Sequence, residues 1–237
     1  MSTITERALA ARIDHAILRP ELTRADVDAE LDIAAAWGVF SVCVRPSDIA
    51  HAVSRLAGSG VAVGTVIGFP HGTTSTAAKV AETRQALADG ATEFDMVINI
   101  GALRSGFDEQ VTADIAAVVA ASGHVTKVIL ETALLDDEQI ARGSRLTERG
   151  GADFVKTSTG FAGGGATSAH IALMRSQVGA GVQVKASGGV RSYADALAML
   201  DAGATRLGTS GSAVILGEAR RVDAGERATG IVDAASY

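Results

Sequence analysis

Short apolar runs alternate with longer segments of helical periodicity along the whole chain. The apolar runs predict eight strands, at 13–18, 40–44, 62–67, 93–99, 125–131, 152–157, 183–187 and 205–209. Between them the spacing of apolar positions predicts helices at 23–37, 47–57, 75–89, 108–121, 136–149, 167–178, 192–202 and 211–216. Thr23, Asp136 and Ser192 stand where helix N-caps are expected.

Strands that alternate with helices form a parallel sheet, and eight such units favour a closed (β/α)₈ (TIM) barrel over an open doubly wound sheet. The junctions 88–91, 149–152 and 202–204 each place glycine where a helix ends and a strand begins. No linker or low-complexity stretch divides the 237 residues. We therefore expect one α/β domain over 1–237, with a flexible, polar tail at 217–237.

The composition and charge of the chain argue against several classes of function. Hydrophobic residues make up 47% of the chain, the net charge is −6, and the basic residues are dispersed. This pattern argues against nucleic-acid partners and membrane-surface binding. No apolar run approaches the ~18 residues of a membrane span, and residues 1–12 lack the apolar stretch of a signal peptide. The single cysteine, Cys43, lies in an apolar run and is expected to be a buried thiol. A cytoplasmic protein is expected.

Lysine is rare, because only four of the 21 basic residues are lysines: Lys79, Lys127, Lys156 and Lys185. Arginine stays protonated, whereas a buried lysine amine can lose its proton and act as a nucleophile. Lys79 falls on what the pattern presents as the polar face of a helix, and for it we expect no special role.

Lys156 and Lys185 occupy equivalent places near the ends of the sixth and seventh predicted strands, and Asp95 lies on the fourth. Neighbouring strands lie ~5 Å apart, so the two ammonium groups should repel and one should deprotonate readily. A neutral lysine amine at that place can form a Schiff base with a carbonyl substrate. The alternative is that both lysines pair with acids such as Asp95 and only fill the barrel.

Glycine-rich loops follow the seventh and eighth predicted strands, at 188–190 and 208–211. In these barrels such loops, next to a helix N-terminus, frequently bind phosphate. The sequence therefore predicts a small phosphorylated substrate.

Three motifs resemble those of the deoxyribose-phosphate aldolase family: Asp-Met-Val-Ile-Asn at 95–99, Val-Lys-Thr-Ser-Thr-Gly at 155–160, and Lys-Ala-Ser-Gly-Gly-Val-Arg at 185–191. Supporting stretches stand at 13–15, 42–44, 68–70, 129–132 and 206–210. They follow the family's order from about residue 8 to 216.

The resemblance implies a class I aldolase that interconverts 2-deoxy-D-ribose 5-phosphate with acetaldehyde and D-glyceraldehyde 3-phosphate, without metal or cofactor. Lys156 would form the Schiff base, Lys185 would lower the pKa of Lys156, and Asp95 would move protons with Lys185 through a water. The expected substrate and phosphate contacts are Thr159, Gly160, Gly188, Gly189, Gly208, Ser210 and Gly211.

The chain departs from the family pattern at two positions. Ala16 stands where the family usually has threonine, and Phe161 stands where some members carry a lysine that can touch phosphate. Phosphate binding would then depend on backbone N–H groups and Ser210. The chain ends in Tyr237, which we expect to relay a proton to the enamine carbon if the tail folds over the barrel mouth; otherwise it is a residue on a frayed end.

Two other functions stay open at this point. A different lysine-dependent barrel, such as a keto-acid phosphate aldolase or a transaldolase-like enzyme, would keep Lys156 but use another donor. A non-catalytic sugar-phosphate-binding barrel would bind without forming an imine. The apolar composition further suggests a homodimer.

Overall fold

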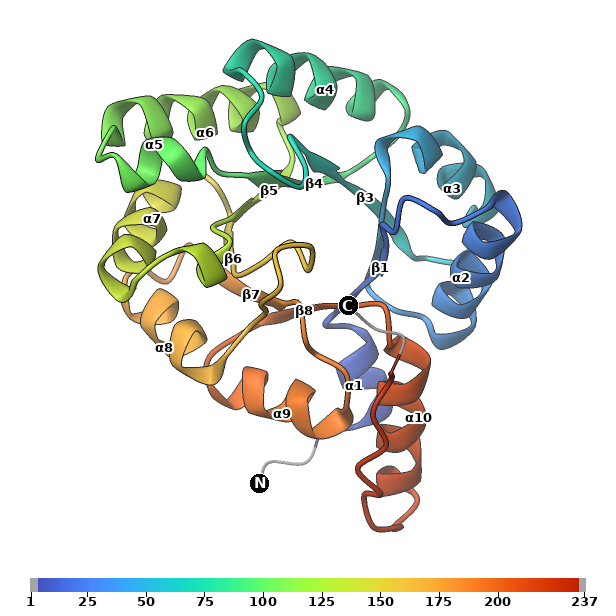
Figure 1. Cartoon of the computed structure of the whole chain (residues 1–237). Coiled ribbons are helices and arrows are strands. Elements are labelled where there is room, and N and C mark those ends of the chain that lie inside the picture. The colour runs from blue at the N-terminus through green and yellow to red at the C-terminus, as the bar shows by residue number, and fades with distance from the viewer. Residues whose placement is uncertain (1–3, 235–237) are drawn as a thin grey trace.

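The computed structural model describes residues 4–234, and its strands form a closed, all-parallel barrel in sequence order (Figure 1). The barrel closes where Ile13 on the first strand pairs with Leu207 on the last. The strands are β1 (Ile13–Ile17), β2 (Ser41–Val44), β3 (Ala62–Ile67), β4 (Glu93–Val97), β5 (Val125–Ile129), β6 (Phe154–Lys156), β7 (Gln183–Ser187) and β8 (Arg206–Thr209). The predicted barrel is confirmed.

The helices form an outer ring around the barrel (Figure 1). They are α1 (Glu6–Ala10), α2 (Arg24–Trp37), α3 (Ile49–Arg55), α4 (Thr76–Ala88), α5 (Ile100–Arg104), α6 (Asp108–Ser122), α7 (Asp137–Arg149), α8 (Ser168–Ser176), α9 (Tyr193–Asp201) and α10 (Ser212–Asp223), with 3₁₀ turns η1 (Pro46–Asp48) and η2 (Thr132–Leu134). Thr23, Asp136 and Ser192 each accept a hydrogen bond from the backbone N–H three residues later, as predicted for N-caps.

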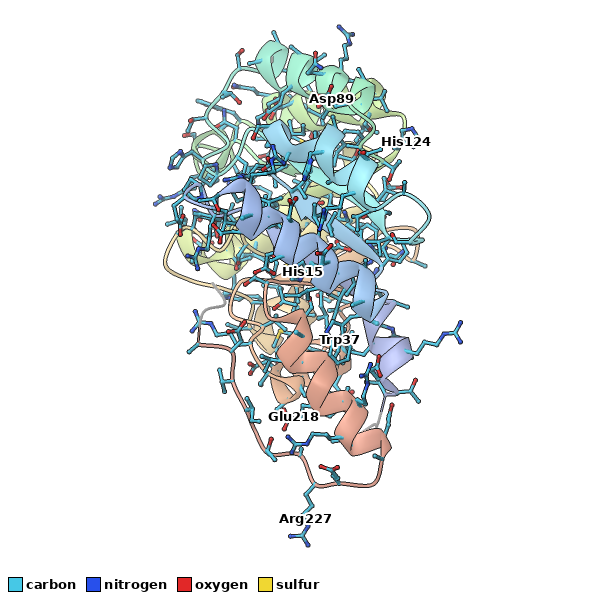
Figure 2. All side chains as sticks on the ribbon, turned by 90° about the vertical axis from the view of Figure 1, so that its right-hand side faces the viewer. His15, Trp37, Asp89, His124, Glu218 and Arg227 are labelled. Atoms are coloured by element: carbon cyan, nitrogen blue, oxygen red, sulfur yellow. The ribbon has the colours of Figure 1, made fainter. Side chains whose placement is uncertain are left out.

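The sequence pattern missed α1 and α5, because five residues are too few to show helical periodicity. It also ended the last helix at residue 216, whereas α10 continues to Asp223. The expected flexible tail is therefore wrong for 217–223, where Glu218 and Ala219 are buried. Beyond α10 the chain turns near Arg227 and returns beside the helix (Figure 2). There Glu218 Oε1 accepts hydrogen bonds from the N–H groups of Thr229 and Gly230.

The hydrophobic core lies between the barrel and the helices. Outward-facing strand residues such as Phe94, Val128 and Leu207 are apolar and fully buried there. The alternate residues point into the barrel and are mostly polar or charged. This division places ionisable groups in an interior that usually holds branched apolar side chains.

Glycines end several helices as predicted. Gly90, Gly151 and Gly203 follow α4, α7 and α9 with φ of 102°, 81° and 111°, in the region that favours glycine. Within residues 4–234, the helices are too short or too polar to traverse a lipid bilayer.

Candidate active site

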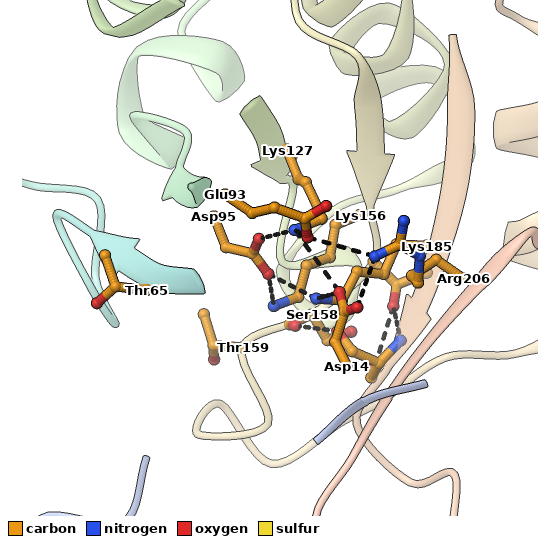
Figure 3. Close-up of polar contacts among 12 residues, drawn as sticks. Asp14, Thr65, Glu93, Asp95, Lys127, Lys156, Ser158, Thr159, Lys185 and Arg206 are labelled. Atoms are coloured by element: carbon orange, nitrogen blue, oxygen red, sulfur yellow. Dashed lines mark hydrogen bonds and ion pairs between the residues drawn. The ribbon is translucent and has the colours of Figure 1, made fainter. Parts of the chain in front are cut away.

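A network of buried charged side chains fills the barrel interior (Figure 3). Each member is at most 8% exposed. The members are Asp14 on β1, Glu93 and Asp95 on β4, Lys127 on β5, Lys156 on β6, Lys185 on β7 and Arg206 on β8.

Asp95 is the central carboxylate of this network. Its Oδ2 accepts hydrogen bonds from Lys156 Nζ at 2.8 Å and Lys185 Nζ at 2.7 Å. Its Oδ1 accepts one from Lys127 Nζ at 2.8 Å. Burial alone would raise the pKa of Asp95, but the three lysines outweigh burial and hold that pKa well below its usual value. Asp95 is therefore ionised.

Lys156 and Lys185 are paired residues on adjacent strands, as predicted, but their environments differ. Lys185 Nζ donates to Asp14 Oδ2 at 2.5 Å as well as to Asp95. Burial opposes the charge on Lys185, yet these two carboxylates prevail and raise its pKa. Among residues 4–234, Lys156 forms an ion pair only with Asp95, so burial, reinforced by repulsion from Lys185, outweighs that carboxylate and lowers the pKa of Lys156.

The predicted repulsion from Lys185 is thus present, but burial makes the larger contribution to the lowered pKa of Lys156. The charge count of the network agrees with a neutral Lys156. The network holds three carboxylates and four cationic side chains. With Lys156 deprotonated, three anions face three cations, which avoids an uncompensated charge in the interior.

Sequence reasoning missed several members of the network. Lys127 bridges Glu93 at 2.7 Å and Asp95, and Arg206 Nη1 donates to Asp14 Oδ1 at 2.7 Å. The Arg206 guanidinium also lies 3.6 Å from the centre of the Phe40 ring. Strand alternation could have indicated an inward-facing Lys127, because that residue is the one charged residue of β5.

The interpretation of Lys79 as a residue on a polar helix face is wrong. Lys79 is fully buried between α4 and α6, where its Nζ donates to Asp114 Oδ2 at 2.5 Å and to the Val97 carbonyl at 2.9 Å. The residues one helical turn away, Thr76 and Glu82, are polar and suggested exposure, but α6 covers this face of α4. Lys79 lies outside the barrel network and supports the end of β4.

Lys156 borders a pocket at the carboxyl ends of the strands. Its lining includes Asp14, Ala16, Leu18, Cys43, Lys156, Thr159, Lys185, Ser187, Gly188, Gly208, Thr209 and Ser210. Four of the predicted substrate contacts, Thr159, Gly188, Gly208 and Ser210, are therefore brought together there. Gly160, Gly189 and Gly211 are not among the lining residues.

Close packing around Gly208 leaves no room for a side chain at this position. A Cβ at this position would lie 3.1 Å from Lys185 Cε and 2.9 Å from Ser187 Cβ. Gly208 therefore leaves space for the lysine side chain. Gly211 precedes α10, and its N–H already donates to Thr209 Oγ1 at 3.0 Å.

The returning tail brings Asp233 to the predicted phosphate site. Its N–H donates to the Arg191 carbonyl at 2.9 Å. A Cβ on Gly211 would lie 2.8 Å from Asp233 Oδ2, so this carboxylate lies close to the N-terminus of α10. Tyr237 lies outside the described residues.

Two other candidate residues, Cys43 and His15, are buried. Cys43 is buried as predicted, and burial raises its pKa to about 11, so it is a thiol at neutral pH. His15, in β1, lies between Ser212 Oγ at 2.8 Å and Glu30 Oε2 at 2.9 Å. Across residues 4–234, His, Cys, Asp and Glu side chains form no group of three or more that could hold a metal ion.

The closed barrel and its buried lysine site define a (β/α)₈-barrel protein with a candidate lysine nucleophile. The model of the DeoC/LacD family of aldolases matches residues 8–218, and the chain belongs to this family.

Individual relatives agree with this assignment. The chain is 55% identical over 208 residues to deoxyribose-phosphate aldolase 2 of Staphylococcus aureus strain MRSA252, which covers 87% of this chain and 94% of the relative. It is 56% identical over 205 residues to deoxyribose-phosphate aldolase 1 of the same strain, covering 86% and 93%. The tetrameric deoxyribose phosphate aldolase of Aeropyrum pernix superposes with a TM-score of 0.85 at 33% identity, covering 92% of this chain and 93% of that one.

Proposed function

We propose that this protein cleaves 2-deoxy-D-ribose 5-phosphate reversibly to D-glyceraldehyde 3-phosphate and acetaldehyde, through a Schiff base on Lys156. The observation that carries the proposal is the environment of Lys156, a buried amine with a lowered pKa that borders the pocket at the carboxyl end of the barrel. The relatives' names, at 55–56% identity, support the substrate.

The first step forms the imine. The neutral Lys156 amine attacks C1 of the open-chain sugar, and loss of water from the carbinolamine gives a protonated imine. Asp95 and Lys185 supply and accept the protons of this step through a water. Because Lys185 keeps its proton, it can act as the acid beside the neutral Lys156.

The second step breaks the carbon–carbon bond. A base removes the proton of the C3 hydroxyl, the C2–C3 electron pair moves into the imine, and D-glyceraldehyde 3-phosphate leaves an enamine on Lys156. We assign the base to Asp95, acting through the water. Protonation of the enamine carbon and hydrolysis of the resulting imine then release acetaldehyde and restore the amine.

The phosphate is proposed to bind between the loops after β7 and β8. The contributors are Gly188 and Ser210 at the pocket, backbone groups near Gly160, Gly189 and Gly211, and the N-terminus of α10. Phe161 packs edge-on against Phe69, with ring centres 5.3 Å apart, at the position where a lysine would have added a positive charge.

Reduction with borohydride in the presence of acetaldehyde tests the proposal. We expect a two-carbon adduct on Lys156 by peptide mass mapping, together with cleavage of 2-deoxy-D-ribose 5-phosphate. Labelling of Lys185 with Lys156 unmodified would overturn the role assignment. Turnover that does not depend on acetaldehyde as the donor would favour another lysine-dependent aldolase, and binding without imine formation would favour a sugar-phosphate-binding protein.

Activity should also survive incubation with EDTA, because the protonated imine supplies the electron sink. Loss of activity that a divalent ion restores would contradict this. A homodimer and a cytoplasmic location stay predictions; sedimentation analysis would distinguish a dimer from a tetramer such as that of Aeropyrum pernix.

A further inference from the structure

Glu131 adopts a backbone conformation that few residues adopt. Its φ is 60°, and among the described residues it is the only one besides glycine with a positive φ. Left-handed conformations of this kind are strained for residues with a side chain and concentrate at functional sites. Glu131 is 1% exposed and follows β5, next to the strand that carries Lys156. The mechanism above gives it no part.

The Glu131 carboxylate is directed at Thr159. Its Oε2 accepts a hydrogen bond from the Thr159 N–H at 3.2 Å and a short one from the Thr159 hydroxyl, and its Oε1 lies 3.4 Å from the same N–H. Within residues 4–234 no lysine, arginine or histidine lies within ion-pair distance of it. Glu131 therefore acts through Thr159 and not through an ion pair.

These contacts fix the direction of hydrogen bonding at the Thr159 hydroxyl. A hydroxyl has one hydrogen to donate and two lone pairs. The hydrogen is given to Glu131, and one lone pair accepts from the Phe161 N–H at 3.0 Å. One lone pair remains, on a residue that lines the pocket of Lys156.

We propose that Glu131 is a positioning residue that holds Thr159 as a hydrogen-bond acceptor, so that Thr159 selects a hydroxyl on the aldehyde fragment of the substrate. This inference rests on the proposed function. The hydroxyl would be the unreacting one, at C4 of 2-deoxy-D-ribose 5-phosphate. A phosphate oxygen cannot donate to Thr159, and the negative charge of Glu131 disfavours an anion there. Thr159 is thus assigned to hydroxyl recognition and not to phosphate binding.

The test measures acceptor preference in the synthetic direction, with acetaldehyde as donor. The two acceptors are D-glyceraldehyde 3-phosphate and 3-oxopropyl phosphate, which has the phosphate but lacks the hydroxyl. The parent protein should prefer the hydroxylated acceptor in kcat/KM. In Glu131→Gln the amide N–H can donate to Thr159, which frees the threonine hydrogen to point into the pocket. We expect this preference to fall about five- to tenfold, the effect of roughly one hydrogen bond.

Matched variants separate this effect from general damage. Thr159→Val should lose the preference, Thr159→Ser should keep it, and adding Glu131→Gln to Thr159→Val should change nothing further. Glu82→Gln is the control, because Glu82 is also a partly buried carboxylate that accepts a backbone N–H, from Gly68 at 2.7 Å, but does not border the pocket. It should leave the preference unchanged.

The pH dependence gives a second measurement. Burial raises the pKa of Glu131. Protonation should therefore begin at a higher pH than for an ordinary glutamate, and the preference should weaken as the pH falls towards that range. The Thr159→Val protein should show no such dependence.

Failure of the inference can be told from failure of the proposed function. Trapping of acetaldehyde on Lys156 requires neither Thr159 nor an acceptor hydroxyl, so its absence in the parent protein would contradict the function. If trapping is normal but the parent shows no preference, or Glu131→Gln keeps the preference intact, only the inference is overturned. If Glu131→Gln does not fold, the Thr159→Val and Thr159→Ser pair still decides the outcome.

Discussion

The two ends of the barrel interior contain the same kinds of charged group but differ in how fully those charges are compensated. Towards the amino end, Arg206 at the start of β8 and Lys127 in the middle of β5 each contact two carboxylates within 3.3 Å, one of which is Glu93 at the start of β4. At the carboxyl end, Lys156 pairs among the described residues only with Asp95, which it shares with two other lysines. Both ends are buried, yet ion pairs outweigh burial at one end, whereas burial lowers the pKa of the Lys156 amine at the other.

Burial alone does not make a lysine reactive. Lys127 and Lys156 are both buried, yet the pKa of Lys127 is raised and that of Lys156 is lowered. In both cases burial opposes the charge, and the number of carboxylates that face each amine decides the result. The following predictions test this difference.

The largest effect is expected for Lys156→Arg. Arginine keeps its charge at neutral pH and cannot form the imine, so cleavage of 2-deoxy-D-ribose 5-phosphate should fall to background. An assay of aldehyde release measures this, with circular dichroism as the folding control. Substantial residual turnover would place the nucleophile elsewhere.

Lys185→Leu should reduce activity at pH 7 by about 10²–10⁴-fold, the usual range for a lost acid–base group. The substitution removes the repulsion of Lys156 and leaves Asp14 and Asp95 with one cation fewer. Both changes raise the pKa of Lys156, so its neutral fraction at pH 7 falls and part of the activity should return as the pH rises. A rate that is unchanged at pH 7 would show that the two amines are not coupled.

Lys127→Met should lower the free energy of unfolding by about 3–5 kcal/mol, because it leaves Glu93 and Asp95 undercompensated in the interior. Lys156→Met should cost clearly less, because Lys156 pairs with Asp95 alone among the described residues and Asp95 retains Lys127 and Lys185. Denaturant titration of the two variants measures the difference. Equal losses would mean that the two ends of the interior do not differ in compensation.

A smaller effect is expected at the proposed phosphate site, where substitutions of Asp233 and Ser210 should change KM in opposite directions. Asp233→Asn should lower KM for the phosphorylated sugar by about two- to fivefold. The Asp233 carboxylate lies near the N-terminus of α10, where it repels the phosphate and offsets the attraction of the helix dipole for it. Ser210→Asp should raise that KM by repulsion. Neither should alter KM for unphosphorylated 2-deoxyribose; equal changes for both sugars would indicate a structural role.

The smallest effect is expected for Tyr237→Phe. If the C-terminal phenol relays a proton to the enamine carbon, hydrogen exchange from solvent into the methyl group of acetaldehyde should slow while imine formation on Lys156 persists. Exchange at the parental rate would show that Tyr237 takes no part.

The barrel and the adjacency of its two central lysines could be predicted from the sequence alone. Strand and helix periodicity repeats locally, and the equivalent places of Lys156 and Lys185 on successive strands follow from their motifs. Asp95 was recognisable for the same reason, because it lies on an inward-facing position of β4.

The other charges that join these residues could not be predicted from the sequence, because they depend on the closed tertiary structure. Asp14, Glu93, Lys127 and Arg206 come from separate strands, and their contacts depend on the registers that close the barrel. The burial of Lys79 depends on how α6 packs on α4, and the contact of Glu131 with Thr159 depends on two loops meeting across neighbouring strands. Such contacts join residues far apart in the sequence, and local periodicity carries no information about them. The burial and the neighbouring charges that lower the pKa of Lys156 are a property of the closed barrel and not of any one segment.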